Sequence, residues 1–255
     1  MALIKAKKQF GQNFLTNDAI KEKIVEVSQV DNEDVIEIGP GLGAITFILA
    51  KKVKSLTAFE IDRDLHQKLS DNLKQDNVEI LLQDFLEFDF NQIKDKVKIV
   101  ANIPYYITSD ILFKLLRNYK KIKSATLMVQ KEVSERLDAK PRTKEYSKLT
   151  VSVNYVCKVK KQFDVKKTNF NPIPKVDSAV ITLEFKDSLP YDLEKFLHFV
   201  KLLFQFKRKT LFNNLIHTYN KEDILNALEK IEALPNVRSE ELSLEQIENL
   251  FKELN

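Results

Sequence analysis

The sequence predicts an α/β protein with a doubly wound, mostly parallel sheet that ends in antiparallel strands, followed by a small all-α domain. Strand-like apolar runs alternate with helical patterns up to about residue 137, which favours parallel strands joined by crossover helices. A glycine-rich loop joins the first strand to a helix, as in nucleotide-binding sheets. Only helical patterns follow a polar linker at residues 186–190. We therefore expect two domains, residues 1–187 with a basic N-terminal arm and residues 188–255.

Composition limits the class of protein. The chain has 255 residues, of which 44% are hydrophobic, so it can bury a full core. No run approaches the roughly 18 apolar residues of a membrane helix, and the first residues lack the apolar core of a signal peptide. A single cysteine, Cys157, excludes an internal disulfide framework, and His66, His198 and His217 are too scattered to suggest zinc. We expect a soluble cytoplasmic protein without a bound metal or a membrane contact.

Charge is distributed unevenly along the chain. The formal net charge is +4, but residues 114–175 contain 17 Lys and Arg against 5 Asp and Glu, which leaves 24 against 32 elsewhere. A solvated face would explain any single lysine. A block this asymmetric favours contact with a polyanion, and RNA or DNA is the obvious candidate.

The first predicted strand, Val35–Ile38, leads into Gly39, Pro40 and Gly41 before a helix from Ile45 to about Lys52. Upstream, three lysines in the first eight residues precede an aromatic loop and a helix capped near residue 17. A glycine turn between strand and helix lets a ligand approach the helix N-terminus, which indicates a nucleotide-type ligand. The proline removes an N–H that could hold a diphosphate, so a dinucleotide is disfavoured. In isolation the glycines could form only a tight turn.

The second predicted strand, Leu56–Ile61, ends with Glu60, which lies 21 positions after Gly39. Open nucleotide-binding sheets place an acid there to accept hydrogen bonds from ribose hydroxyls. Asp62 is a rival for this role, but capping the helix at residues 63–74 is its simpler function.

The third predicted strand, Val78–Leu82, is followed by Asp84 and Phe85. An acid beside an aromatic ring at a strand end can hydrogen-bond an adenine amino group and pack beside its ring. An Asp that merely starts a turn is equally compatible with the sequence.

The fourth predicted strand, Lys98–Ala101, is followed by Asn102, Ile103, Pro104 and Tyr105 before a helix at residues 109–117. Open α/β sheets do their chemistry at the carboxyl ends of strands. An amide, a proline and an aromatic ring can hydrogen-bond the edge of a flat base and stack on its face. An ordinary strand-to-helix turn is the alternative.

The later part of the chain completes both domains. A fifth strand is expected at 125–129 and a helix at 131–137, and the basic loop at 139–146 could be a mobile substrate flap or a solvated connector. Two more strands are expected at 158–165 and 179–185, and the two prolines between them can hold Phe170 in a fixed place. Helices are expected at 193–216, 221–233 and 244–254.

Five motifs together resemble those of one known family. They are Phe10–Leu15, Glu37–Gly43, Asn102–Tyr106, Gln130–Val133 and Phe170–Ser178. In this order they resemble the rRNA adenine dimethyltransferases, specifically the KsgA (RsmA) type that acts on the small ribosomal subunit, and Lys207–Leu211 is similar to a further family feature. The erythromycin-resistance methylases share the first motifs, but the last two fit the small-subunit type better. Gly and Arg are usual in the family where Ser147 and Lys148 stand here.

The resemblance implies a Rossmann-like class I methyltransferase that uses S-adenosylmethionine. Its expected reaction is N6,N6-dimethylation of two adjacent adenosines in the 3′-terminal hairpin loop of small-subunit rRNA, within ribosome biogenesis, by a monomer. Asn13, Leu15 and Gly39 would line the donor pocket, together with Gly41 and Phe85, and Asn102 would lie between the donor and the target.

The resemblance also assigns roles to the polar site residues. Glu60 would hold the donor's ribose hydroxyls and Asp84 its adenine amino group. The Asn102 side-chain oxygen and the Ile103 backbone carbonyl would accept the two amino hydrogens of the target adenine. Pro104 would shape the pocket, and the target base would be clamped between Tyr105 and Phe170.

Two other classes of protein share part of this pattern. A nicotinamide-dependent oxidoreductase would also use the glycines and the acid on the second strand, but it has no need of the loop after the fourth strand or of the basic block. A non-catalytic RNA-binding assembly factor could keep both the fold and the basic surface.

Overall fold

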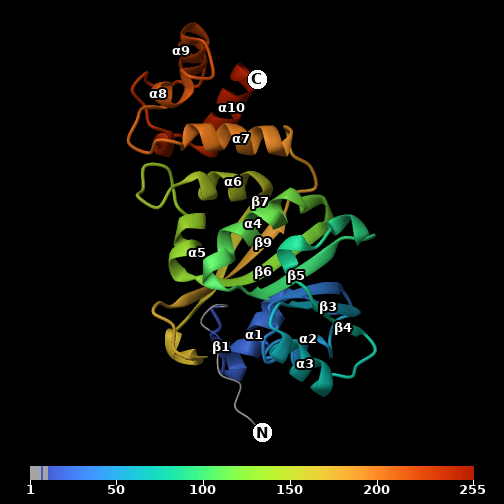
Figure 1. The fold of residues 1–255 in the computed structure, drawn as a ribbon. Helices are drawn as coiled ribbons and strands as arrows, with labels where there is room; N and C mark the ends of the chain where they lie inside the picture. Colours follow the sequence, from blue (N-terminus) through green and yellow to red (C-terminus); the bar gives the residue numbers. More distant parts are fainter. Residues whose placement is uncertain (1–6, 8–10) are drawn as a thin grey trace. The chain divides into compact units, whose positions relative to one another are not determined.

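A computed structural model of the chain describes residue 7 and residues 11–255, which form two compact units (Figure 1). The first contains the described residues up to Ser134 together with Lys158–Asp187, and the second contains Glu135–Cys157 and Ser188–Asn255. Lys5, Lys8 and Phe10, which belong to the expected basic arm and the first motif, lie outside the described residues.

A seven-stranded sheet organises the first unit, with strand order β4-β3-β2-β5-β6-β9-β7. Neighbouring strands from β4 to β6 are parallel, and β9 is antiparallel to β6, so the expected mixed sheet is confirmed. Its strands are β2 (Asp34–Ile38), β3 (Ser55–Glu60), β4 (Val78–Leu82), β5 (Val97–Asn102), β6 (Ile122–Gln130), β7 (Cys157–Val165) and β9 (Ser178–Phe185). A separate antiparallel pair joins β1 (Phe14–Leu15) to β8 (Phe170–Asn171).

The strand order places a topological switch between β2 and β5. From β2 the chain first adds β3 and β4 on one side, and it then returns to add β5 and β6 on the other. These central strands are buried and rich in Val and Ile, as expected for parallel strands covered on both faces. Ligands of such sheets bind where the order reverses, outside the carboxyl ends of the strands.

Two helices of the first unit begin at side-chain caps. Asn17 accepts a hydrogen bond from the N–H of Ile20 at the start of α1 (Asp18–Ser28), and Asp62 accepts from the N–H of Asp64 at the start of α3 (Arg63–Asn72). The other helices of this unit are α2 (Thr46–Leu49), α4 (Thr108–Arg117) and the first turn of α5 (Lys131–Leu137), the rest of which groups with the second unit. α2 is shorter than the expected helix because tighter turns continue it to Lys52.

The second unit is helical, and it includes a segment that the sequence assigned to the first domain. Its helices are α6 (Lys148–Val156), α7 (Leu193–Leu203), α8 (Leu211–Leu215), α9 (Lys221–Lys230) and α10 (Leu244–Leu254). Residues 135–157 belong here because α6 is buried along almost its whole length and the Tyr155 ring stacks on the Phe196 ring of α7, with centroids 3.7 Å apart. Only the boundary after residue 187 coincides with the expected one.

The expected helix at residues 193–216 is two helices, α7 and α8. Turns at residues 204–209 separate them, and the side chain of Thr210 caps α8 by accepting from the N–H of Asn213. The Asn214 side chain accepts a hydrogen bond from the N–H of Phe206 at 3.0 Å, which stabilises the interruption.

The basic loop at residues 139–146 is fastened to the rest of the second unit. The N–H of Arg142 donates to the Glu240 carbonyl at 2.7 Å, and the buried Tyr146 ring contacts Phe204. Burial raises the pKa of Tyr146 to about 12. These contacts favour the connector interpretation of this loop over the mobile flap.

Within the described residues, no helix is both long and apolar enough to span a bilayer.

Candidate functional site

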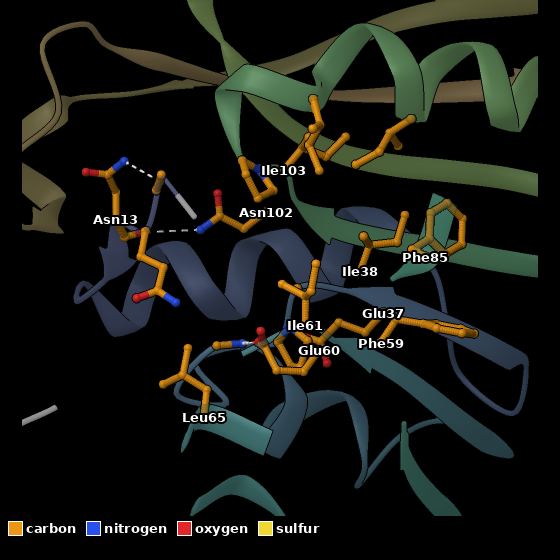
Figure 2. A pocket seen from close by; sticks show the side chains of 18 of the residues that line it. Asn13, Glu37, Ile38, Phe59, Glu60, Ile61, Leu65, Phe85, Asn102 and Ile103 are labelled. Carbon is orange, nitrogen blue, oxygen red and sulfur yellow. Dashed lines mark hydrogen bonds between the residues drawn. The ribbon is translucent and has the colours of Figure 1, made fainter. Parts of the chain in front are cut away.

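A pocket lies at the switch point, bordered by the loops that follow β2, β3, β4 and β5 (Figure 2). The sequence-predicted site residues are brought together here with one exception, Phe170. Those that line the pocket are Asn13, Leu15, Gly39, Gly41, Glu60, Asp84, Phe85, Asn102, Ile103, Pro104 and Tyr105. Residues up to 92 positions apart therefore converge on one concave surface, as expected for a ligand site.

The glycine loop adopts a backbone that side chains disfavour. Gly39, Gly41 and Gly43 have φ of 66°, 61° and 82°. A Cβ on Gly43 would lie 2.5 Å from Phe47 and 2.7 Å from Leu69, so this glycine is required for packing. A Cβ on Gly39 would meet nothing closer than 3.9 Å, so this position leaves room for a ligand to approach the backbone.

Glu60 is held at the pocket by backbone N–H groups. One carboxylate oxygen accepts from Gly41 at 3.0 Å and the other accepts from Asp62 at 2.9 Å. Burial raises the pKa of Glu60 above its ordinary value, although these hydrogen bonds act in the opposite direction. Each oxygen keeps a second lone pair. Glu60 can therefore accept hydrogen bonds from two ligand hydroxyls, which fits the ribose role expected for it.

Glu37 is a second buried acid beside Glu60. It is 3% exposed, and its Oε2 atom has no hydrogen-bond partner among the described residues. Burial raises the pKa of Glu37 to about 8, and the neighbouring Glu60 carboxylate acts in the same direction. At neutral pH Glu37 is therefore mainly a neutral acid. The sequence analysis quoted Glu37 only as part of a motif.

Asp84 and Phe85 combine both interpretations made from the sequence. Asp84 accepts from the N–H of Leu86 at 2.8 Å and so begins a turn, yet it also lines the pocket. The Phe85 ring is buried and packs edge-on against Phe59, with centroids 5.5 Å apart. The exposed side chain of Ile61, which the sequence analysis did not single out, adds an apolar wall. The combination suits a flat aromatic ring with one polar edge.

Asn102 faces the N-terminal segment across the pocket (Figure 2). Its side-chain nitrogen donates to the backbone oxygen of Asn13 at 3.5 Å, which orients the amide. Its neighbour Ile103 donates its N–H to the Met128 carbonyl at 3.1 Å, so the backbone here continues the sheet. Within the described residues the amide oxygen of Asn102 has no donor, so it can accept a hydrogen bond from a ligand.

Phe170 is not part of this group. Its backbone pairs with Leu15 in the β1-β8 ribbon, and its ring is 3% exposed within a core cluster that includes Val165 and Val180. The structure does not bring Phe170 to the pocket, because burying this apolar ring in the core is more favourable than exposing it to water. The opposing ring Tyr105 does line the pocket.

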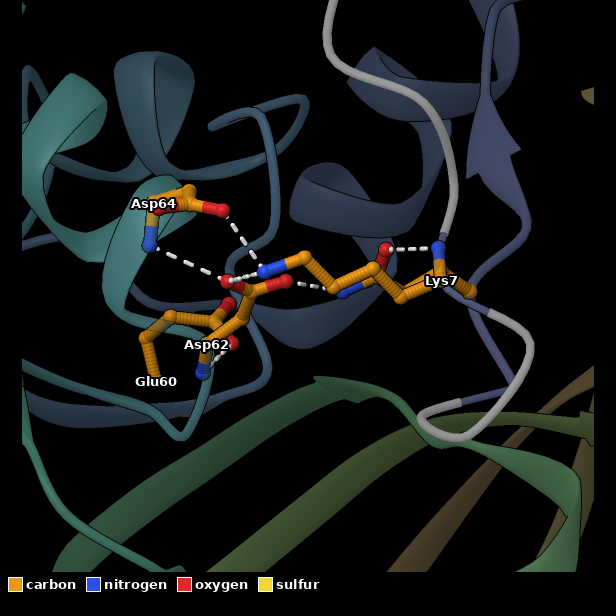
Figure 3. Close-up of polar contacts among 5 residues, drawn as sticks. Lys7, Glu60, Asp62 and Asp64 are labelled. Atoms are coloured by element: carbon orange, nitrogen blue, oxygen red, sulfur yellow. Dashed lines mark hydrogen bonds and ion pairs between the residues drawn. The ribbon is translucent and has the colours of Figure 1, made fainter.

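A polar cluster that the sequence analysis did not foresee ties the N-terminal segment to the end of β3 (Figure 3). Asp62, whose side chain is fully buried, accepts from Lys7 at 2.7 Å and from Gln12 at 2.9 Å. Burial alone would raise the pKa of Asp62, but these two donors, together with the N–H of Asp64 and the charge of Lys7, leave the pKa below its ordinary value. Asp62 thus caps α3 as expected and also anchors the segment that carries Asn13.

Metal ligation is not supported by the described part of the chain, where no group of three or more His, Cys, Asp or Glu side chains could hold an ion.

Comparison with known proteins gives a consistent result. Residues 3–255 match the family model described as ribosomal RNA adenine dimethylase. A protein named ribosomal RNA small subunit methyltransferase A from Metamycoplasma arthritidis is 55% identical over 247 residues, covering 97% of this chain and 95% of the relative. A protein of the same name from Fusobacterium nucleatum is 43% identical, with 97% of each chain covered.

Two solved structures resemble the whole chain. A dimethyladenosine transferase from Plasmodium falciparum has a TM-score of 0.82 and 29% identity, covering 93% of this chain and 95% of that one. The 23S rRNA methyltransferase ErmE has a TM-score of 0.72 and 28% identity, covering 95% of this chain and 99% of that one.

Proposed function

The chain belongs to the ribosomal RNA adenine dimethylase family, and from this membership and the geometry of its pocket we propose that it dimethylates two adjacent adenosines of small-subunit rRNA at N6. The enzyme is an S-adenosylmethionine-dependent methyltransferase. The observation that carries the proposal is the placement of Asn102 and Tyr105 on the same pocket as Glu60 and Asp84. The loop after β5, which would orient the target amine, and the ends of β3 and β4, which would bind the nucleoside of the donor, then border one pocket.

Donor binding is assigned to the residues that border β2, β3 and β4. Glu60 would accept from the ribose hydroxyls, Asp84 from the adenine amino group, and Phe85 would pack against the adenine ring. Gly39 leaves the space through which the rest of the donor reaches Asn102. Bound S-adenosylmethionine supplies an electrophilic methyl group.

Orientation of the target amine is assigned to the loop after β5. The exocyclic nitrogen of adenine is a poor nucleophile because its lone pair is delocalised into the ring. The Asn102 amide oxygen and the Ile103 carbonyl would accept its two hydrogens and turn the lone pair toward the methyl group. Positioning of this kind lowers the barrier without a metal or a strong base. Pro104 shapes this part of the pocket, and Tyr105 offers its ring to a base that has left its stack.

RNA binding is assigned to the basic surfaces of the two units. In the first, exposed lysines lie along β7 and in the segments after it, namely Lys158, Lys160, Lys161, Lys166, Lys167 and Lys175. In the second, exposed cations gather in two loops, namely Lys140, Arg142, Lys144, Lys207, Arg208 and Lys209. Contacts of these cations with phosphates release counterions, so RNA affinity should fall steeply with salt while donor affinity hardly changes. We further propose that the enzyme acts as a cytoplasmic monomer without a metal.

Replacement of Asn102 by Ala tests the proposal. Transfer from labelled S-adenosylmethionine to unmethylated small subunits should fall at least 100-fold, because the amine would lose its main acceptor, while donor affinity stays within about threefold. Asn72→Ala, at the exposed end of α3 and outside the pocket, is the matched control. Methyl transfer by Asn102→Ala near the wild-type rate would refute the assigned role.

The same assay separates two rival functions. An enzyme of the ErmE kind would methylate large-subunit rather than small-subunit rRNA, so both subunits should be offered. A non-catalytic assembly factor would bind small subunits without turnover of the labelled donor.

A further inference from the structure

Ser178, the first residue of β9, contacts the loop that carries the proposed target-binding ring. Its hydroxyl lies 2.8 Å from the Tyr105 hydroxyl, which is a hydrogen bond between residues 73 positions apart. Ser178 is 0% exposed, whereas Tyr105 is only part-buried. Ser178 is therefore out of contact with water, whereas part of Tyr105 is not. The hydrogen bond to Ser178 thus holds the hydroxyl end of the Tyr105 side chain in place.

The backbone around Tyr105 does not fix the ring by itself. Tyr105 begins a 3₁₀ turn of three residues (Tyr105–Ile107), and its preceding residue, Pro104, offers no side-chain cap. The Thr108 hydroxyl donates to the Tyr105 carbonyl at 3.2 Å, which holds the main chain but leaves the side-chain torsions free. A restraint on the hydroxyl is what selects one ring orientation.

Ser178 also shares a framework with the amine-orienting residues. Strand β6 pairs through Met128 with Asn102 of β5 and through Gln130 with Ser178 of β9. The Met128 carbonyl additionally accepts the N–H of Ile103. One central strand thus sets the positions of the amide, of the backbone carbonyl and of the hydroxyl that restrains the ring. A target base in this place would have its amine edge beside Asn102 and Ile103 and its face against the Tyr105 ring, and the three residues would keep a fixed spacing.

We propose that Ser178 is a positioning residue for methyl transfer, which holds the Tyr105 ring at the angle at which the target adenine stacks with its amine against Asn102. The proposal deepens the function given above and rests on it. Ser178 touches neither donor nor amine in this arrangement, and it acts only through the hydrogen bond to Tyr105. Loss of the bond would broaden the orientations of the ring and lower the fraction of bound adenines in the reactive geometry.

A double-mutant cycle tests this role. Ser178→Ala and Tyr105→Phe each remove one hydroxyl of the same bond and keep the ring. Each variant should lower kcat on unmethylated small subunits about tenfold, and the double variant should be no slower than either single one, because all three lack the same bond. Affinity for S-adenosylmethionine should stay within twofold of wild type in all of them.

A matched control removes a buried serine hydroxyl that has no hydrogen-bond partner in the described part of the chain. Ser134 on α5 is 2% exposed, and its Oγ atom has no hydrogen-bond partner within the described residues. Ser134→Ala should leave kcat unchanged. Urea unfolding of each variant gives the folded fraction, by which kcat is corrected. If Ser178 only stabilised the fold, the loss of kcat in Ser178→Ala would disappear after this correction.

The outcomes are distinct. If wild type is active and Ser178→Ala has the same kcat, the positioning role is wrong and the proposed function stands. The same holds if the losses of kcat in the two single variants multiply in the double variant. A wild-type protein that binds S-adenosylmethionine but transfers no methyl group to either subunit would overturn the proposed function, and the positioning role with it.

Discussion

Replacing Glu37 by Gln should remove a pH dependence from the stability of the chain. Glu37 is buried beside Glu60 on β2, and burial raises its pKa to about 8 from an ordinary value of 4.5. The folded protein therefore holds a proton that the unfolded chain releases between these two values. Stability contributed by such a raised acid is greatest below pH 4.5, falls as pH rises, and levels off above about pH 8. Gln cannot ionise, so its variant lacks this decline.

The magnitude follows from the pKa difference. One pKa unit corresponds to about 1.4 kcal/mol, so wild type should lose about 2–3 kcal/mol relative to Glu37→Gln between pH 5.5 and 7.5. The absolute stability of the variant also depends on how well the buried amide finds partners, but that contribution does not change with pH. The informative quantity is therefore the change with pH of the difference in unfolding free energy.

Urea unfolding at closely spaced pH values measures this difference. Glu79→Gln, which removes an exposed carboxyl from β4 of the same sheet, is the control for a general loss of charge. A difference between wild type and Glu37→Gln that stays constant from pH 5.5 to 7.5 would show that Glu37 is not protonated in the folded state.

Three further predictions concern the pocket and the basic surface. Gly43→Ala should lower the free energy of unfolding by about 1–3 kcal/mol in urea titrations, because the added Cβ overlaps the side chains of Phe47 and Leu69. Glu60→Gln should weaken S-adenosylmethionine binding about tenfold or more by calorimetry and should also lower the melting temperature, since the amide offers one acceptor oxygen in place of the two that accept from backbone N–H groups in wild type. Lys160→Glu should weaken RNA binding and reduce the slope of log affinity against log salt without changing donor affinity, and an unchanged slope would count against phosphate contact at β7.

The sequence predicted the strands of the parallel sheet well because two local signals agreed there, namely a short apolar run and the turn residues at its ends. Val35–Ile38 and Val78–Leu82 are short apolar runs bounded by turn residues, and the structure has strands at both places. Strands that are buried in a parallel sheet need this composition. The alternation of such runs with helical patterns was enough to predict a parallel, doubly wound sheet and the edge where the pocket lies, but not the order of the strands.

Helix α6 escaped prediction because its composition favours a strand. Val151, Val153 and Val156 are β-branched, and all are buried, so the segment shows no polar face from which a helical period could be seen. Packing against α7 overrides this preference, and it also moves residues 135–157 into the second unit. A domain boundary set by such tertiary contacts could not be found from local composition.

Eleven of the residues that line the pocket were predicted as site residues, but the hydrogen bonds that hold them were not. Glycines and acids at strand ends carry a positional signal, since the carboxyl ends of parallel strands share one edge. The contact of Ser178 with Tyr105 and that of Gln12 with Asp62 join residues 73 and 50 positions apart. Nothing in the local sequence indicates such a pair, because it depends on the strand order and on the path of the N-terminal segment.

The resemblance to the family and the structure disagree about Phe170, which is a clamp for the target base in the first and a core residue in the second. A conservative substitution can decide between these two roles. As a clamp for the target base, its ring would need an open face, but it is 3% exposed and packed among core residues. Phe170→Ala would open a cavity that costs about 3–5 kcal/mol, so any loss of activity in that variant could reflect unfolding alone. Phe170→Leu keeps most of the apolar volume and is the better probe. If the ring is a core residue, this variant should lose roughly 1 kcal/mol of stability in urea and keep kcat on small subunits within twofold after correction for folded protein. A tenfold lower kcat with unchanged stability and donor affinity would instead mean that the segment around Phe170 rearranges to expose the ring when RNA binds.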